Sequence, residues 1–130
     1  MSFTLQNVYA TFLLALVAWR EARGEPVEAQ LGVIWSVENR VARGGWWGTN
    51  EVTVILFPKQ YSSFDVGDPN ATKFPTANDP VFSNMLVMAQ APGADPTNGA
   101  THYYSGDVVP YWASSMTHTI DLGALHFYKV

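Results

Sequence analysis

Apolar residues dominate the first quarter of the chain and recur at the three- and four-residue spacing of a helix. Apart from aromatic rings, the only polar side chain between Val8 and Trp19 is Thr11. A helix that is apolar on nearly every side must be surrounded by protein, so residues 4–24 are predicted to form a central, buried helix. Gly24 suits the left-handed residue that often ends a helix.

A second helix is predicted over residues 26–45. Pro26 cannot continue the first helix, but it fits the first position of a new one. The expected apolar face of this helix consists of Val27, Leu31, Ile34, Trp35 and Val41. The glycines at positions 44 and 45 end the pattern.

Shorter elements follow, separated by turns rich in Gly, Pro and Asn. Two more helices are predicted, over residues 51–56 and over residues 80–91, the latter starting after Asp79. Between them, residues 60–67 are predicted to be an extended stretch or hairpin, and residues 68–80 a polar loop. Three short strands are predicted within the last segments, at 100–105, 115–123 and 124–130. Helices followed by a small antiparallel sheet define an α+β fold.

The composition narrows the classes of function. Hydrophobic residues make up 48% of the 130 positions, which is typical of one globular domain, expected to span residues 1–130. The net charge is −4 and no basic run occurs, so nucleic acid is not expected as a partner. Cysteine is absent, which excludes disulfides and thiolate chemistry. No cofactor is expected, and the chain is expected to act as a monomer.

Charged residues gather at the end of the first predicted helix, in the segment WREARGEP (residues 19–26). Glu21 follows Val17 and Ala18 at helical spacing, and a carboxyl held against apolar side chains has a raised pKa. Such a carboxylic acid keeps its proton near neutral pH and can donate it to a leaving oxygen. Charged pairs at helix ends are common on protein surfaces, so this segment alone does not establish a catalyst.

Glu25 has a different expected role, because it directly precedes Pro26 at the start of the second helix. The helix dipole favours a carboxylate there, so Glu25 is predicted to cap this helix. Arg23 is expected to pair with Glu25 or Glu28 and to hold the turn between the two helices.

Five short segments stand in order along the chain. The first is EARGEP, followed by Gln30 and by Asn39–Arg40–Val41; the second is FPKQYSSF; the others are DPTNGATHYY, PYWA and LGALHFY. Together they resemble the cell wall hydrolase family of the spore cortex-lytic SleB type, with Tyr61 where the family has Phe. The resemblance extends from about residue 12 to residue 128, and residues 66–80 have no counterpart in it.

The resemblance implies a fold of the lysozyme or lytic transglycosylase type and cleavage of the MurNAc–GlcNAc bond in peptidoglycan. It places Glu21 at the position of the family's catalytic glutamate and Glu25 at the second glutamate of the motif, a secondary candidate. His102 and His126 match family positions and are expected to support the site from behind. A wall-anchoring domain, which many relatives carry, is not expected in this chain.

Two reaction types remain open. Hydrolysis usually requires two carboxyls across the scissile bond. Phage-type lysozymes carry the second one nine residues after the catalytic glutamate, where this chain has Gln30. A lytic transglycosylase requires only one carboxyl, which protonates the glycosidic oxygen and then accepts the proton of the C6 hydroxyl. We therefore favour a lytic transglycosylase over a muramidase, for which Asp65 or Asp68 would have to supply the second carboxyl.

Polar and aromatic residues of the later segments are candidates for substrate binding. Hydrogen bonds to sugar hydroxyl and acetamido groups are expected from Gln60, Ser62 and Ser63. Flat faces on which pyranose rings stack are expected from Tyr103, Tyr104, Tyr111 and Trp112. These residues are expected to line a groove that binds the sugar chain. Neighbours on a strand point to opposite faces, so only one of Tyr103 and Tyr104 is expected to face this groove.

Two other classes of function remain as alternatives. A zinc peptidase of the cell wall would use His102, His118 and His126, but these histidines lack the short spacing of a zinc site, so no metal is expected. A non-catalytic glycan-binding or virion module would keep the aromatic groove and make Glu21 dispensable.

The cellular location and the export route are predicted from the N-terminal segment MSFTLQN, which has no Lys or Arg before the apolar run. We therefore expect no signal peptide, and the run itself is too short to span a bilayer. The expected protein is a phage endolysin, made in the host cytoplasm and released through a holin, or a bacterial relative delivered by another route.

Overall fold

The computed structural model describes residues 5–130, with side chains from residue 7 onward. The predicted start of the first helix at residue 4, and the first residues of MSFTLQN, lie outside the described residues. The helices are α1 (Leu5–Ala22), α2 (Val27–Arg43), α3 (Glu51–Leu56) and α4 (Pro80–Gln90), with the 3-10 turns η1 (Ser62–Phe64) and η2 (Tyr111–Ser115). The strands are β1 (His102–Ser105), β2 (Thr117–Leu122) and β3 (Leu125–Lys129).

Helix α1 lies at the centre of the helical part of the molecule, as its apolar sequence predicted. Every residue from Leu13 to Arg20 is buried, and the helix packs against α2, α3 and α4. Packing on all sides explains the apolar sequence of residues 13–20, whereas Val8, Tyr9 and Phe12 in the first turns are exposed, contrary to the prediction of a helix buried throughout. None of the helices in residues 5–130 is long and apolar enough to cross a membrane.

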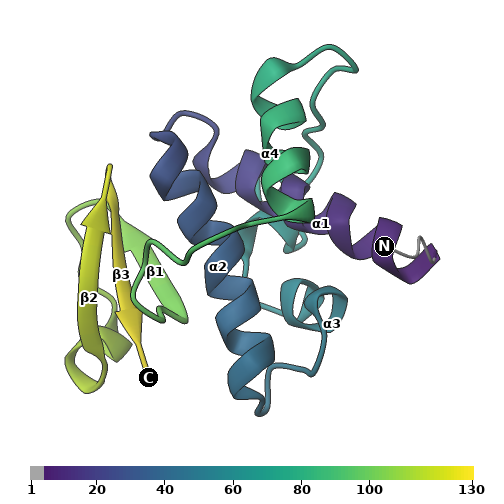
Figure 1. Ribbon diagram of the computed structural model, residues 1–130. Coiled ribbons are helices and arrows are strands. Elements are labelled where there is room, and N and C mark those ends of the chain that lie inside the picture. The colour runs from purple at the N-terminus through teal and green to yellow at the C-terminus, as the bar shows by residue number, and fades with distance from the viewer. Residues whose placement is uncertain (1–4) are drawn as a thin grey trace.

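Helix α2 lies between the other helices and the sheet (Figure 1). Of its predicted apolar face only Ile34 is buried, and Val27 is 55% exposed. The buried residues are Ala29, Gln30, Gly32, Val33, Ile34, Ser36, Val37 and Arg40. Small residues are required on the side of the sheet, because a Cβ on Gly32 would lie 2.6 Å from the Phe127 ring of β3. The predicted face was only partly correct, because Leu31, Trp35 and Val41 are partly buried and a helix that is packed on two sides does not show one apolar stripe.

The sheet has three antiparallel strands in the order β1-β3-β2. Each of the three predicted strand segments contains one of them, so the prediction of a small antiparallel sheet is confirmed. Leu125 and Phe127 of β3 are buried, and Phe127 meets α2. Because side chains alternate along a strand, His126 and Tyr128 point to the opposite, outer face.

Residues 60–67 do not form the predicted extended stretch or hairpin. They contain the 3-10 turn η1, in which the Phe64 N–H donates to the Tyr61 carbonyl at 2.9 Å. The loop is closed by Asp65, whose Oδ1 accepts a hydrogen bond from the backbone N–H of Lys59 at 2.9 Å. An aspartate that binds nearby backbone favours a turn over extended chain. This interaction was not evident from the sequence pattern.

Asp79 starts α4, as predicted. Its Oδ1 accepts a hydrogen bond from the Phe82 N–H at 3.0 Å, and Pro80 occupies the first helical position. Its Oδ2 accepts a second bond from Nε1 of Trp19 at 3.3 Å. The same carboxylate therefore caps α4 and joins it to the end of α1.

Candidate active site

Glu21 lies in the last turn of α1, where two hydroxyl groups point at its carboxyl. Ser63 donates to Oε2 of Glu21 from its hydroxyl at 2.8 Å and from its backbone N–H at 3.4 Å. Tyr103 of β1 donates its hydroxyl to Oε1. Both carboxyl oxygens are thereby fixed by residues from a loop and a strand that are distant in sequence.

Burial raises the pKa of Glu21 and is the strongest influence on this group. The hydrogen bonds from Tyr103 and Ser63 lower the pKa and partly offset burial, whereas the negative charge of Asp68 raises it. The net shift is upward, in the direction that the sequence predicted. Glu21 remains partly exposed. A carboxyl that keeps its proton to a higher pH than an ordinary glutamate is therefore still accessible from solvent.

Arg20 precedes Glu21 in the helix and holds Ser63 in place. Its Nη1 donates to the Ser63 carbonyl at 3.2 Å, and its Nε donates to the Lys73 carbonyl at 3.0 Å. The side chain is buried, and its Cζ lies 4.6 Å from the centroid of the Phe64 ring. Arg20 and Glu21 thus bind the same serine through different groups. This role of Arg20 was not predicted from the sequence, although a charged residue inside an apolar helix is a signal of a buried polar contact.

The Glu21 carboxyl faces a cleft of about 240 Å³. Its walls come from the end of α1, from α2, from the loop after α3 and from β1. The lining residues are Glu21, Arg40, Lys59, Gln60, Tyr61, Ser62, Tyr103, Tyr104 and Ser105. Among the residues that the structure describes, Glu21 is the only carboxylic acid in this lining.

Arg40 brings a fixed positive charge to the cleft. Its Cζ lies 5.3 Å from the Trp47 ring centroid and 5.0 Å from that of Tyr61. Its Nε donates to the Thr101 carbonyl at 2.6 Å and its Nη1 to Oε1 of Gln60 at 3.2 Å. The salt bridges formed by the described side chains do not include Arg40. Its charge is therefore held by rings and neutral acceptors.

The predicted substrate-binding residues fall into two places. Gln60, Ser62, Tyr103 and Tyr104 line the Glu21 cleft. As predicted for neighbours on a strand, their rings point to opposite faces of β1: the Tyr103 ring lies 5.5 Å from the Phe127 ring and the Tyr104 ring 4.9 Å from the His126 ring, between centroids. Both residues nevertheless contribute to the lining. Trp112 is not part of the lining and packs against the Tyr104 ring on the outer face, with 6.0 Å between centroids.

Neither of the histidines at family positions has a described contact with Glu21. His102 is buried, and its ring lies 6.0 Å from the Trp47 ring and 5.2 Å from the Trp112 ring, measured between centroids. Burial and the nearby charge of Arg40 lower the pKa of His102 to about 4. His126 lies on the outer face of the sheet.

His118 and His126 bind the same carboxylate. Oδ1 of Asp121 lies 2.7 Å from Nε2 of His118 and 2.8 Å from Nδ1 of His126. His102 is not part of this group. Within residues 5–130, no cluster of three or more His, Cys, Asp or Glu side chains is arranged to hold a metal ion.

Glu25 does not cap α2 as predicted, because Pro26 takes the N-cap position without a side-chain hydrogen bond. Instead, Oε1 of Glu25 accepts a hydrogen bond from the Ala124 N–H at 2.7 Å, in the turn between β2 and β3. Its backbone carbonyl accepts another from Nε2 of Gln30 at 3.0 Å. The approach is close: a Cβ on Gly123 would lie 2.5 Å from this Oε1. Glu25 therefore joins the sheet to the connection between α1 and α2.

Arg23 does not pair with Glu25 or Glu28, as the sequence had predicted. Its Nη1 donates to the carbonyl groups of Trp19 at 3.3 Å and Arg20 at 3.0 Å. These carbonyls belong to the last turn of α1, where backbone acceptors have no partner within the helix. Arg23 is thus the C-terminal cap of α1.

The two candidates for a second carboxyl do not line the cleft. Asp65 binds the backbone of Lys59, and Oδ1 of Asp68 accepts a hydrogen bond from the Asn70 N–H at 2.8 Å. The charge of Asp68 acts on Glu21 by raising its pKa. Both aspartates stabilise turns, so the cleft presents one carboxyl.

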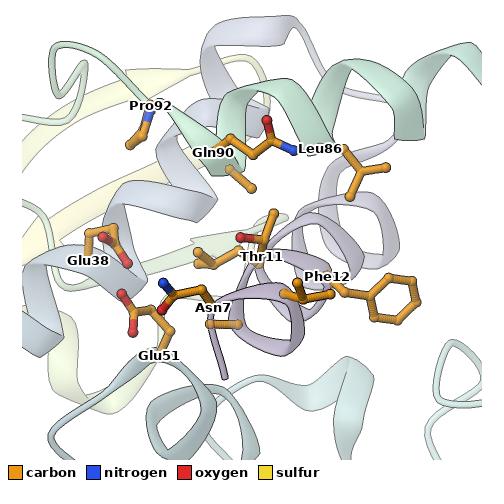
Figure 2. Close-up of a pocket in the computed structure, with 12 residues that line it drawn as sticks. Asn7, Thr11, Phe12, Glu38, Glu51, Leu86, Gln90 and Pro92 are labelled. Atoms are coloured by element: carbon orange, nitrogen blue, oxygen red, sulfur yellow. The ribbon is translucent and has the colours of Figure 1, made fainter. Parts of the chain in front are cut away.

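A larger pocket of about 580 Å³ lies near the other end of α1 (Figure 2). Asn7 and Thr11 line it, and Glu38 of α2 and Glu51 of α3 point toward each other within it. Burial, and then the charge and hydrogen bond of Glu51, raise the pKa of Glu38 to about 7. Sequence reasoning missed this pair, because its members lie on different helices.

The Glu38–Glu51 pair does not have the geometry of a glycosidase. The two carboxyls point toward each other, and Glu51 acts directly on the pKa of Glu38, whereas catalytic carboxyls stand about 5 Å or more apart, on either side of the sugar bond. The cleft of Glu21 is therefore the better candidate for catalysis.

Comparison with known proteins identifies the fold and the family. The Cell Wall Hydrolase family matches residues 24–128, a range that begins just after Glu21. The catalytic domain of the germination-specific lytic transglycosylase SleB from Bacillus anthracis is similar in structure, with a TM-score of 0.76, 24% identity and 99% of both chains covered. The catalytic domain of Bacillus cereus SleB gives a TM-score of 0.74 at 24% identity, covering 99% of this chain and 94% of the other. No curated protein matches the chain.

The chain belongs to the Cell Wall Hydrolase family, so the resemblance seen in its sequence is confirmed. Its fold is the predicted lysozyme-like α+β fold. Membership of this family makes it a peptidoglycan-degrading enzyme, which acts on the bacterial cell wall.

Proposed function

We propose that the protein is a lytic transglycosylase that cleaves the MurNAc–GlcNAc bond of peptidoglycan, with Glu21 as its single catalytic carboxyl. The observation that carries the proposal is that Glu21 is the only carboxylic acid lining its cleft within the described part of the chain, and burial raises its pKa. One carboxyl that donates and then accepts a proton suffices for a transglycosylase but not for the usual two-carboxyl hydrolysis. The fold shared with a protein named a lytic transglycosylase supports the same choice.

In the proposed reaction, Glu21 donates its proton to the glycosidic oxygen while the bond from that oxygen to C1 of MurNAc breaks. GlcNAc leaves with a new 4-hydroxyl group. The C6 hydroxyl oxygen of the same MurNAc bonds to C1, and Glu21, now a carboxylate, accepts the hydroxyl proton. The product is 1,6-anhydro-MurNAc, and no water is consumed. Attack from within the same sugar has a high effective concentration and requires no second carboxyl to position a nucleophile.

Ser63 and Tyr103 are proposed to serve both protonation states of Glu21. A hydroxyl both donates and accepts hydrogen bonds, so each can stabilise the carboxylate and remain bonded to the protonated acid. Arg20 holds Ser63 in position by donating a hydrogen bond to the serine carbonyl. Gln60, Ser62 and Tyr104 are proposed to bind the sugar rings beside Glu21.

We also propose that residues 1–130 form one catalytic domain. The family match spans residues 24–128, and the structural matches cover 99% of the chain. Glu25 is proposed to act structurally, through its bond to the turn at Ala124, and not on the substrate.

The proposal is tested by the Glu21→Gln variant in a turbidity assay on purified peptidoglycan. An amide has no proton to transfer, so clearing should fall by a factor of roughly 100 or more while the circular dichroism spectrum is unchanged. Glu25→Gln is the matched control, the same change in the same segment, and should keep most of the activity. If Glu21→Gln clears peptidoglycan at the normal rate, Glu21 is not the catalytic acid.

A further inference from the structure

The outer face of the sheet carries rings and a carboxylate where a solvent face would usually carry mixed polar side chains. In the strand register Tyr128 lies between His102 and His118, and His126 lies between Tyr104 and Asp121. Two rows therefore cross the three strands on the face opposite Phe127. Helix α2 packs on the Phe127 side, so it does not cover these rows.

Trp112 of η2 completes this surface. Its ring centroid lies 6.0 Å from that of Tyr104 and 5.5 Å from that of Tyr128. The His126 ring lies 4.9 Å from the Tyr104 ring, and the His118 ring 5.1 Å from the Tyr128 ring. We call the surface formed by Tyr104, Trp112, His118, Asp121, His126 and Tyr128 the aromatic platform.

The platform remains accessible, although its rings touch. The Tyr104, Trp112 and Tyr128 side chains are partly exposed, and those of His118 and Asp121 are exposed. Asp121 is held at the edge by bonds to both histidines. A surface with flat apolar faces in its centre and hydrogen-bonding groups at its edge suits a ligand with the same two features.

A pyranose ring has both features, since its axial C–H groups form an apolar face and its hydroxyl and acetamido groups surround the edge. An anionic polymer is disfavoured, because Asp121 lies on the platform and the chain has a net charge of −4. Charge and shape together favour contact with uncharged sugar rings over contact with a polyanion.

The platform is continuous with the cleft of Glu21. Tyr104 belongs to both: it lines the cleft, and its ring packs against Trp112 and His126. We propose that the aromatic platform is a second binding surface, on which the glycan strand of peptidoglycan continues after it leaves the cleft beside Glu21. This inference rests on the proposed function, because it assigns more of the same polymer to a surface outside the catalytic cleft.

The test measures binding without cleavage, in the Glu21→Gln background. Sedimentation with insoluble peptidoglycan sacculi gives the affinity, which Trp112→Ala should weaken by about tenfold. Trp46→Ala is the matched control: Trp46 is 60% exposed, lies off the platform and should leave binding unchanged. Unchanged binding of a folded Trp112→Ala variant would overturn the proposal, as would equal losses in the two variants.

A second measurement needs no change to the platform, so it remains decisive if Trp112→Ala does not fold. The chain has three histidines, and the NMR signals of their rings are followed while soluble glycan fragments prepared from peptidoglycan are added to Glu21→Gln protein. The signals of His118 and His126 should shift as glycan is added and should stop shifting when binding is saturated. Binding that moves neither signal contradicts the platform. A different result would contradict the proposed function: cleavage of peptidoglycan by the Glu21→Gln variant. That result does not depend on the outcome of the binding measurements.

Discussion

Tyr103 donates its hydroxyl to Oε1 of Glu21, although 82 positions separate the two residues in the chain. This bond joins the end of the central helix to the first strand of the sheet. The catalytic competence of Glu21 is therefore predicted to depend on correct packing of the sheet, as well as on helix α1.

The bond gives a prediction about pH. The hydrogen bond from Tyr103 lowers the pKa of Glu21, so Tyr103→Phe should raise that pKa further above its ordinary value. A general acid works below its pKa, so the alkaline limb of the activity profile should move to higher pH. Activity at the optimum should fall roughly tenfold, because a hydrogen bond to a charged group contributes about 1.5–3 kcal/mol.

The measurement is the initial rate of peptidoglycan clearing against pH for Tyr103→Phe and the unaltered protein. Ser63→Ala removes a second bond that lowers the pKa, so it should move the limb in the same direction. A limb that moves to lower pH in either variant contradicts the assignment of Glu21 as the acid.

The turn between β2 and β3 gives a prediction about stability. A Cβ on Gly123 would lie 2.7 Å from Cδ of Pro26, and its φ of +56° is strained for other residues. Gly123→Ala should therefore destabilise the fold by about 1–3 kcal/mol. Thermal unfolding followed by circular dichroism measures the loss.

Gly24→Ala is the matched control. Nothing lies within 4 Å of a Cβ on Gly24, and its φ is not in the left-handed region that the sequence pattern had predicted for it. The change should leave the free energy of unfolding within about 0.5 kcal/mol. Equal losses of unfolding free energy in the two variants would contradict this prediction. They would show that the close approach of Glu25 and Pro26 to Gly123 does not restrict the residue at this position.

The Glu38–Glu51 pair gives a prediction with a defined pH window. The folded-state pKa of Glu38 is raised from the ordinary carboxyl range to about 7, so the fold favours its protonated form. Its contribution to stability is present below the pKa of the unfolded chain and is lost as pH rises through about 7. Glu38→Gln should thus stabilise the protein at pH ~8 by about 1 kcal/mol, a value reduced by solvent screening of partly exposed groups.

Unfolding of Glu38→Gln in urea at pH ~5 and pH ~8 checks this, with a gain expected only at the higher pH. Glu28→Gln is the control on the same helix, at an exposed position in the first turn of α2. It should give no gain at either pH. A gain for Glu38→Gln that is equal at both pH values would mean that its charge is not the cause.

The elements were largely predictable because their signals are local. The apolar run of α1, Asp79 before Pro80 and the alternating strands each lie within one short segment. The buried face of α2 was not predictable in the same way, because the Phe127 ring against Gly32 depends on a strand far along the chain.

The candidate active site was likewise predictable only where its signal is local in the sequence. Glu21 was identified from its apolar neighbours and from the family resemblance, and its raised pKa follows from burial. The bonds that hold it come from Ser63 and Tyr103, and Ser63 is held in turn by Arg20. Such partners are decided by packing, so sequence spacing could suggest Ser63 and Tyr103 for sugar binding but not for contact with the acid.

The central claim is that one carboxyl performs a transglycosylase reaction, and the products of digestion test it most directly. Purified peptidoglycan is digested to completion, and the released muropeptides are analysed by mass spectrometry with and without borohydride treatment. We predict fragments that end in 1,6-anhydro-MurNAc, which are one water lighter than reducing ends and are not reduced by borohydride. Reducible MurNAc ends as the main product would contradict the account, because they require hydrolysis and a second group to position water.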